Sequence, residues 1–192
     1  DGVLTLTGRG TMGSRLRQSA RNTAKFNKWI AGLVGLLTPG ATVTGVTPVE
    51  VSDLRSPARI EARFVAPGIT KREGKTARVS LPWPRLYQVT PNYKLPERKY
   101  DLLLGVPQLL DLNVRYTLPR GARVISALTS ETIDAPCSRF VRTVSGGRNE
   151  VRVTGRLSGR CERVRPDNYL AQRRFAKRVD ELNSESFVLR IR

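Results

Sequence analysis

The sequence predicts an α+β fold, mostly β, in which a helix packed on an antiparallel sheet is followed by an Ig-like β-sandwich variant with a C-terminal helix and strand. From Leu110 to Leu118 apolar and polar residues alternate, which is typical of a strand with one buried face. Apolar residues at helical spacing occur in two stretches, 14–37 and 166–182. The other apolar runs are short, and Gly or Pro residues separate them.

The first predicted domain covers residues 1–95 and has the order β-α-β-β-β. Val3–Thr7 reads as a strand, and Ser14 is placed to cap a helix that runs to Leu37, where Thr38-Pro39-Gly40 ends it. The polar stretch 71–75 is expected to be a loop. Its Gly74-Lys75-Thr76 is not a P-loop, because the earlier glycine is missing and a strand follows. Further strands are predicted at 41–51, 58–66 and 77–81.

The predicted helix has an apolar side and a basic side. Basic residues recur at i, i+4, i+8 and i+11, and no acidic residue occurs between Gly2 and Val49. Either the helix covers a sheet and its basic side faces water, or this side binds an anionic membrane or nucleic acid. The basic residues are Arg17, Arg21, Lys25 and Lys28. The apolar residues are Leu16, Ala20, Phe26, Ile30, Leu33, Val34 and Leu37.

Residues 81–96 are predicted to form a linker or an extended crossing segment, because they are rich in proline and aromatic residues. Trp83, Tyr87 and Tyr93 could stack on a ligand or pack the two domains together. The second predicted domain, residues 96–192, begins with a short strand at 100–104 and the alternating strand at 110–118. The apolar run 124–128 would be the neighbour of that strand.

The rest of the second domain is predicted to contain a hairpin, a helix and a final strand. The hairpin joins 140–144 to 150–158 about Ser145-Gly146-Gly147-Arg148, so that Arg152 and Arg156 face outward. Pro166 suits the first turn of a helix that runs to about Leu182. The last strand contains Phe187, Leu189 and Ile191.

The composition favours anionic partners and excludes several kinds of catalysis. The formal net charge is +18, from 34 basic and 16 acidic residues. Such a charge suits nucleic acid, acidic polysaccharide or anionic lipid, but the basic residues are mostly Arg, as a GC-rich genome would also produce. No histidine is present, which excludes Ser-His-Asp and Cys-His catalysis and His-containing zinc sites within this chain. We expect no enzyme activity, no cofactor and no metal.

The two cysteines, Cys137 and Cys161, form either a disulfide or two buried thiols. A turn at 145–148 would place Cys137 opposite Arg156, so a disulfide would require the chain to fold back near Gly159. The longest apolar run, Trp29–Leu37, is about half of a membrane span, and no integral membrane segment is expected. The chain starts within a strand pattern, which favours a trimmed form or a piece of a longer protein.

Several motifs resemble the C-terminal accessory module of bacterial transglutaminase-like proteins. The motifs are PGATV (39–43), DLRSPARI (53–60), ERKYDLLLGVP (97–107), LPRGARV (118–124), RPDNYLAQRRF (165–175) and FVLRI (187–191). The resemblance implies an upstream β-sandwich and a papain-like core that contains the Cys-His-Asp residues. No residue here matches a catalytic position. Family members are usually exported, which implies a periplasmic or otherwise extracytoplasmic location and permits a disulfide.

Two functions are therefore expected as alternatives. The first is a non-catalytic accessory or scaffold pair of domains that contacts the transglutaminase-like core, of the same chain or of a cleaved precursor, or other protein subunits. The second is a protein that binds an anionic polymer through a basic face made of Arg17, Arg21, Lys25, Lys28, Arg152 and Arg156.

Overall fold

A computed structural model describes residues 1–81, 89–105, 107, 109–147 and 149–191. The fold is mostly β, with 44% of residues in strands, three α-helices among the described residues and several antiparallel sheets. The chain divides into two compact units, Asp1–Ile69 and Thr70–Arg192. The predicted division lay at 95–96 instead. The difference arises because residues 70–80 form two strands that join a sheet of the second unit.

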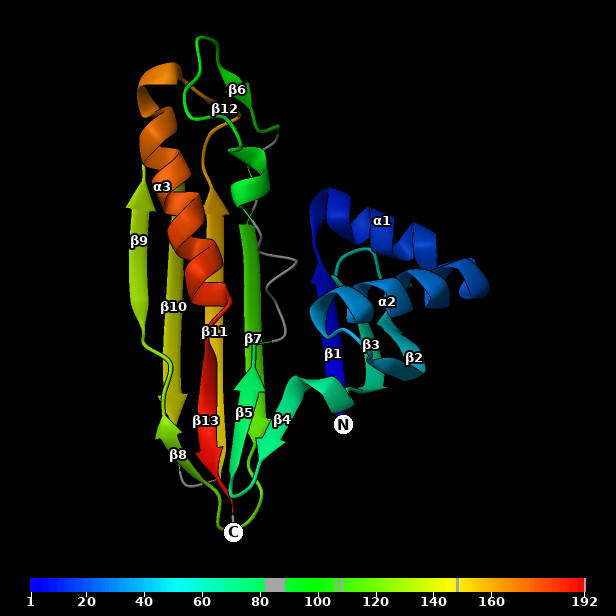
Figure 1. Ribbon diagram of the computed structural model, residues 1–192. Coiled ribbons are helices and arrows are strands. Elements are labelled where there is room, and N and C mark those ends of the chain that lie inside the picture. Colours follow the sequence, from blue (N-terminus) through cyan, green and yellow to red (C-terminus); the bar gives the residue numbers. More distant parts are fainter. Residues whose placement is uncertain (82–88, 106, 108, 148, 192) are drawn as a thin grey trace. The chain divides into compact units, whose positions relative to one another are not determined.

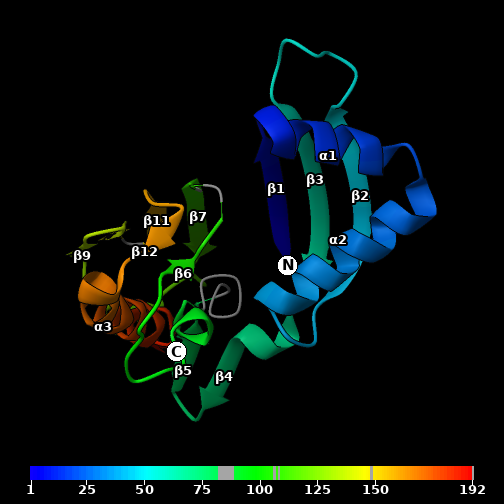
Figure 2. The ribbon, with the colours of Figure 1, turned by 90° about the horizontal axis from the view of Figure 1, so that it is seen from above.

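Unit 1 is a three-stranded antiparallel sheet, in the order β1-β3-β2, with two helices on one face (Figure 2). The buried core lies between these layers and includes Leu16, Phe26, Ile30, Val34 and Ile60. Strand β3 alternates buried and more exposed residues because every second side chain points at the helices. The elements are β1 (Gly2–Gly8), α1 (Gly10–Ala20), α2 (Thr23–Leu37), β2 (Thr42–Glu50), β3 (Ala58–Val65) and the 3₁₀ helix η1 (Pro67–Ile69).

The prediction of one helix over 14–37 is wrong, because the structure has two helices with a break at Arg21-Asn22. Asn22 has an extended backbone, and its side-chain oxygen accepts a hydrogen bond from the backbone N–H of Lys25 at 3.1 Å. This is an N-cap, and it starts a new helix at Thr23. The predicted basic row therefore does not lie on one continuous helix.

Unit 2 contains two four-stranded antiparallel sheets, β7-β11-β10-β9 and β4-β5-β13-β8, and a two-stranded ribbon, β12-β6 (Figure 1). Its strands are β4 (Thr70–Glu73), β5 (Thr76–Ser80), β6 (Leu102–Leu103), β7 (Leu109–Thr117), β8 (Arg123–Ser126), β9 (Glu131–Ala135), β10 (Ser138–Gly146), β11 (Glu150–Gly159), β12 (Arg163–Val164) and β13 (Ser186–Arg190). The helices are η2 (Thr90–Asn92) and α3 (Pro166–Asn183).

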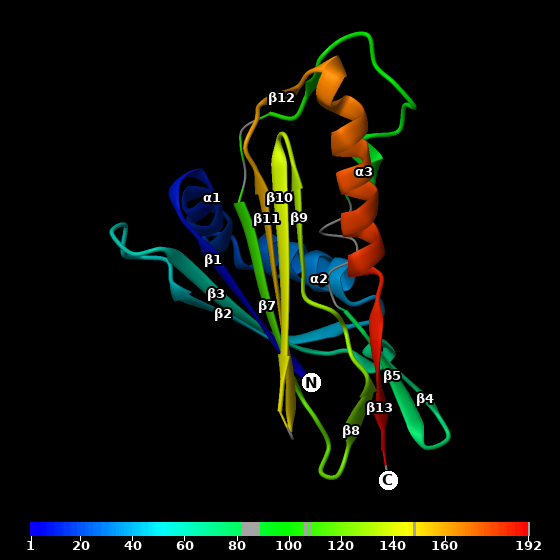
Figure 3. The same ribbon diagram turned by 90° about the vertical axis from the view of Figure 1, so that its left-hand side faces the viewer.

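The sheet β7-β11-β10-β9 has the longer strands, and we call it the larger sheet; β4-β5-β13-β8 is the smaller sheet. One face of the larger sheet is covered by two different elements. Helix α3 lies over one half of that face, and the smaller sheet lies over the other half (Figures 1 and 3). Tyr116 of β7 joins the two sheets, because its ring meets Phe187 of β13 edge-on at 5.1 Å and its hydroxyl donates to the Ser80 carbonyl. An Ig-like sandwich is not confirmed, since a helix occupies part of the second layer.

The predicted strands of unit 2 are found, but one predicted pairing is wrong, that of the run 124–128 with the alternating segment. The alternating segment is β7, which pairs with β11, whereas β8 pairs with the last strand, β13. The polar stretch 71–75 is not a loop, because most of it belongs to the hairpin β4–β5, with Gly74 at a φ of 57° in the turn. Helix α3 and strand β13 occupy the predicted positions. Residues 82–88 of the predicted linker, including Trp83 and Tyr87, lie outside the described residues.

Candidate functional site

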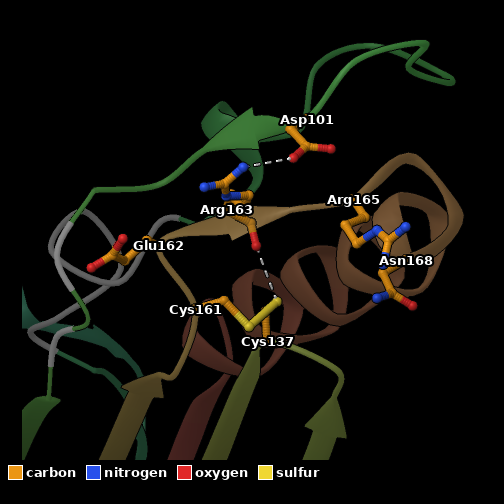
Figure 4. A pocket seen from close by; sticks show the side chains of 7 residues that line it. All are labelled: Asp101, Cys137, Cys161, Glu162, Arg163, Arg165 and Asn168. Carbon is orange, nitrogen blue, oxygen red and sulfur yellow. Dashed lines mark hydrogen bonds and ion pairs between the residues drawn. A yellow bond between two sulfur atoms is a disulfide. The ribbon is translucent and has the colours of Figure 1, made fainter.

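A surface hollow of about 720 Å³ lies at the N-terminal end of α3, beside the ribbon β6–β12 (Figure 4). The ends of three elements meet here: the start of β10, the chain that leaves β11, and the first turn of α3. The lining residues are Asp101, Cys137, Cys161, Glu162, Arg163, Arg165 and Asn168. Acidic and basic side chains both line the hollow, and Arg163 forms an ion pair with Asp101 at 3.6 Å.

Cys137 and Cys161 form a disulfide at the base of this hollow, with their Cα atoms 5.1 Å apart. The register of β10 and β11 explains why they meet. Ser138 pairs with Gly159, and the N–H of Arg160 donates to the Cys137 carbonyl at 2.8 Å. The predicted register, with Cys137 opposite Arg156, is wrong by four residues because β10 continues to Gly146, two residues past its predicted end, which moves the turn along the chain. Arg156 pairs with Val141 instead.

A buried glutamine fixes the helix to the strand next to the disulfide. Gln172 of α3 is fully buried, and its amide nitrogen donates to the Ser138 hydroxyl at 2.5 Å. Its side-chain oxygen accepts from the backbone N–H of Cys137 at 3.3 Å. Because both ends of the amide have partners, the burial of this polar group costs little. Gln172 therefore holds α3 in register against the start of β10.

Farther along the same helix, a buried arginine joins three segments. The Arg142 side chain on β10 is 1% exposed. Its Nη1 donates to the Leu182 carbonyl at 2.5 Å, and its Nη2 forms an ion pair with Glu185 at 2.6 Å. Its Nε and Nη2 also donate to the carbonyl and hydroxyl of Thr129, at 2.9 and 3.2 Å. Leu182 lies in the last turn of α3, where the helix dipole favours a cation.

An adjoining side of α3 holds the segment 89–98, which includes the C-terminal part of the predicted linker. The Asp180 carboxylate accepts hydrogen bonds from the N–H groups of Val89 and Thr90, at 2.8 and 3.0 Å. The Tyr169 hydroxyl donates to the Leu95 carbonyl at 2.9 Å, and its ring lies 5.9 Å from that of Tyr93. Tyr93 is buried here, so it packs its segment against α3 rather than forming an open stacking surface.

The model of the family called "Domain of Unknown Function with solved-structure structure (DUF3858)" matches residues 80–189. The chain belongs to the DUF3858 family. The matched DUF3858 region contains β7 to β12, α3, the disulfide, Gln172 and Arg142. It thus includes the hollow and both buried polar contacts between α3 and β10.

One solved structure resembles this DUF3858 chain beyond the matched region. It is a crystal structure from Parabacteroides distasonis ATCC 8503, a "putative protease" by its name. The identity is 10%, the TM-score is 0.51, and the likeness covers 79% of this chain but 40% of that longer one. At this identity the likeness shows a shared fold. No curated protein matches the sequence.

Four acidic groups of the DUF3858 chain have pKa values that are shifted away from neutral pH. Hydrogen bonds from Arg178 lower the pKa of Glu131, and hydrogen bonds from the Ser56 hydroxyl and the Arg55 N–H lower the pKa of Asp53. Burial raises the pKa of Tyr93 and of Tyr116. Each of these shifts moves the group away from pH 7, whereas general acid–base catalysis needs a pKa near the working pH.

The six residues of the predicted anion-binding face fall into both units of the DUF3858 chain, three of them on or next to α2. Arg17 of α1 is half-buried and donates to the carbonyls of Asp53 and Ser56, at 2.8 and 2.5 Å. Arg156 binds Asp111 through two hydrogen bonds, at 2.5 and 3.0 Å, which raise the pKa of Arg156. The others are Arg21, Lys25 and Lys28 around the start of α2, and Arg152 on β11.

The outer face of the larger sheet in the DUF3858 region balances its charges across strands. Arg115 of β7 binds Glu150 at 2.6 Å, and Arg152 lies 3.9 Å from the same residue. On the other edge Asp134 pairs with Arg160 at 2.8 Å. The exposed Arg152 and Arg156 thus have acidic neighbours that reduce the positive charge of this face.

Two kinds of reactive site, a metal centre and a free thiolate, can be checked among the described residues. Within the described ranges, no group of three or more His, Cys, Asp or Glu residues is placed to hold a metal ion. The two cysteines are bonded to each other, so neither supplies a thiolate. In the same described ranges, no helix is long and apolar enough to cross a membrane. Sequence reasoning singled out Cys137 and Cys161 but left a disulfide and two buried thiols as alternatives. It missed Arg142 and Gln172, which lie at inward-facing positions of β10 and α3.

Proposed function

We propose that this chain is a non-catalytic accessory pair of domains of an extracytoplasmic, periplasmic transglutaminase-like protein in bacteria. The observation that carries the proposal is chemical. The sequence has no histidine, and its two cysteines are joined, so a papain-like reaction would lack both its nucleophile and its base. The disulfide also fits an oxidising compartment.

In this proposal the partner is the catalytic core of the same protein or of a cleaved precursor. The likeness covers 40% of the solved structure with a similar fold, which fits a role of this chain as one part of a longer protein. Exposed apolar side chains around β6 offer a contact surface, since large side chains that are well exposed often mark interfaces. Tyr100 is 83% exposed and Leu103 is 76% exposed.

The first experiment is the intact mass and N-terminal sequence of the native protein from its source. The proposal expects a longer protein, or a cleaved partner, that contains a Cys-His-Asp core. That core should bind the chain, and Tyr100→Ser with Leu103→Ser should weaken binding at least about tenfold. Ile125→Ser on β8, also exposed, is the matched control. A native protein without such a core, or amide hydrolysis by the isolated chain, would contradict the proposal.

A further inference from the structure

One side of helix α2 is exposed and carries a mixture of basic and apolar residues. Lys25, Trp29, Gly32 and Leu36 are spaced i, i+4, i+7 and i+11, so they form one row along the helix. We call this row the α2 row. Trp29 is 44% exposed and Leu36 is 45% exposed. The buried residues of α2 are Phe26, Ile30, Val34 and Leu37.

The second half of α2 is therefore apolar on its outer side as well as its inner side. From Trp29 to Leu37 the helix has no charged or hydrogen-bonding side chain except the indole N–H of Trp29. A Cβ atom added at Gly32 or at Gly35 would meet nothing within 4 Å, so the helix backbone is open there. An ordinary surface helix carries polar residues on its outer side.

The first half of α2 and its approach are positively charged. Residues 10–37 contain five basic residues and no acidic residue. Arg17 donates hydrogen bonds to the carbonyls of Asp53 and Ser56. In contrast, Arg21, Lys25 and Lys28 are exposed and form no salt bridge with any described residue. Lys25 lies in the α2 row, one turn before Trp29, and Lys28 lies on the adjoining solvent side.

We propose that the α2 row docks unit 1 on an anionic lipid surface. Trp29 and Leu36 enter the boundary between headgroups and acyl chains, where tryptophan is favoured because its ring is apolar and its N–H is polar. Lys25, Lys28 and Arg21 contact the phosphates of the anionic headgroups. Charge complementarity selects this partner, because Lys25 and Lys28 lie on the exposed side of α2 together with Trp29 and Leu36, and Arg21 lies in the break just before this helix.

A nucleic acid or an acidic polysaccharide fits the row less well. Such a polymer would use the three cations but would leave the apolar Trp29 and Leu36 in water. An interfacial helix uses both kinds of residue at once, since its affinity is the sum of buried apolar area and attraction to anionic lipid.

The test measures co-sedimentation of the intact chain with vesicles of phosphatidylglycerol and with vesicles of phosphatidylcholine. The expected result is binding to phosphatidylglycerol that exceeds binding to phosphatidylcholine at least about tenfold and falls as salt is added. In a Trp83→Phe background, the Trp29 emission should shift to shorter wavelength on binding. Equal binding to both lipids, or no binding to phosphatidylglycerol at low salt, would overturn the proposal.

A matched pair of glycine substitutions separates docking from folding. Gly32→Glu places an acid in the α2 row, and Gly45→Glu places one on strand β2 of the same unit. Both glycines are exposed, and neither site has an atom within 4 Å of an added Cβ. Gly32→Glu should weaken vesicle binding at least about fivefold, whereas Gly45→Glu should have little effect. Equal effects of the two substitutions would contradict docking through this row.

Further variants distinguish the other occupants. Leu36→Ser should weaken vesicle binding without changing the charge, and Leu54→Ser, at another exposed leucine of unit 1, should not. Wild-type affinity of Leu36→Ser together with a loss in Lys25→Glu/Lys28→Glu would indicate a polyanion site and overturn the proposal. Binding of a second copy, seen as a dimer that Gly32→Glu abolishes without vesicles, would also overturn it. None of these outcomes depends on the proposed transglutaminase-like core.

Discussion

The buried guanidinium of Arg142 on strand β10 donates a hydrogen bond of 2.5 Å to the carbonyl oxygen of Leu182, in the last turn of α3. The same side chain satisfies the carbonyl of Thr129 and pairs with Glu185. One residue thus joins the larger sheet, the segment before β9, the end of α3 and the segment before β13. Buried charges of this kind are stable only while all their partners are present.

We expect Arg142→Met to lower the free energy of unfolding by about 3–5 kcal/mol, because two carbonyls and a carboxylate lose their donor. Urea denaturation followed by circular dichroism would measure this change. Arg139→Met, at an exposed position of the same strand, should change the stability by less than about 1 kcal/mol. Similar losses in both variants would show that Arg142 has no special role.

Reduction of the disulfide should destabilise unit 2. The bond joins residues separated by 24 positions, and in the chain-entropy model a loop of that size gives about 3 kcal/mol. Cys137→Ser/Cys161→Ser should therefore unfold at lower urea than the oxidised chain and should not respond to dithiothreitol. If the reduced and oxidised chains unfold at the same urea concentration, this bond does not contribute to stability.

Asp180→Asn should loosen the attachment of Val89 and Thr90, at the start of η2, to α3. The carboxylate accepts two backbone N–H bonds, and the amide can replace one of these acceptors. Hydrogen exchange at the Val89 and Thr90 amides should accelerate about tenfold or more, while exchange in β10 stays unchanged. Glu181→Gln is the control, since the neighbouring Glu181 pairs with exposed Lys177 and Arg178. Equal protection in both variants would count against this anchoring role.

The ion pair Glu131–Arg178 should stabilise the fold at neutral pH but not at acidic pH. Two hydrogen bonds, at 2.9 and 2.6 Å, lower the pKa of Glu131 below its ordinary value of 4.5. A carboxyl with a lowered folded-state pKa stabilises the fold above its unfolded pKa, and this contribution disappears as pH falls through the folded pKa. Glu131→Gln should be less stable than wild type at pH 7 by under about 1 kcal/mol. The difference should shrink below about pH 4, as urea midpoints would show; a difference that is constant with pH would contradict it.

Local patterns predicted most elements but not their partners. The alternation in β7 and the helical spacing in α3 are set by residues only a few positions apart, so a single sequence is enough to predict them. The break before α2 was missed, although Asn22 is a favoured N-cap residue, because the apolar spacing continues across it. The position of β8 beside β13 depends on pairing between distant segments, which a one-dimensional pattern does not contain.

The buried polar contacts were the hardest to predict. Arg142 lies between Phe140 and Val144 at inward positions of β10, and this was the available signal. An arginine is ordinarily assigned to the surface, because its burial requires partners that come from elsewhere in the chain. Glu185 and Leu182 lie 43 and 40 residues away. The disulfide register was missed for a smaller reason, a turn centred two residues too early.

Strand β13 follows the other three strands of its sheet in the sequence, yet it lies in the interior of that sheet, between β5 and β8. During synthesis, β5 and β8 leave the ribosome with unpaired edges, and neither can complete the sheet until residues 186–190 have emerged. Unpaired edges are sites at which chains associate wrongly. The sheet therefore closes only after the residues of β13 have been added, and until then the edges of β5 and β8 that β13 covers stay unpaired.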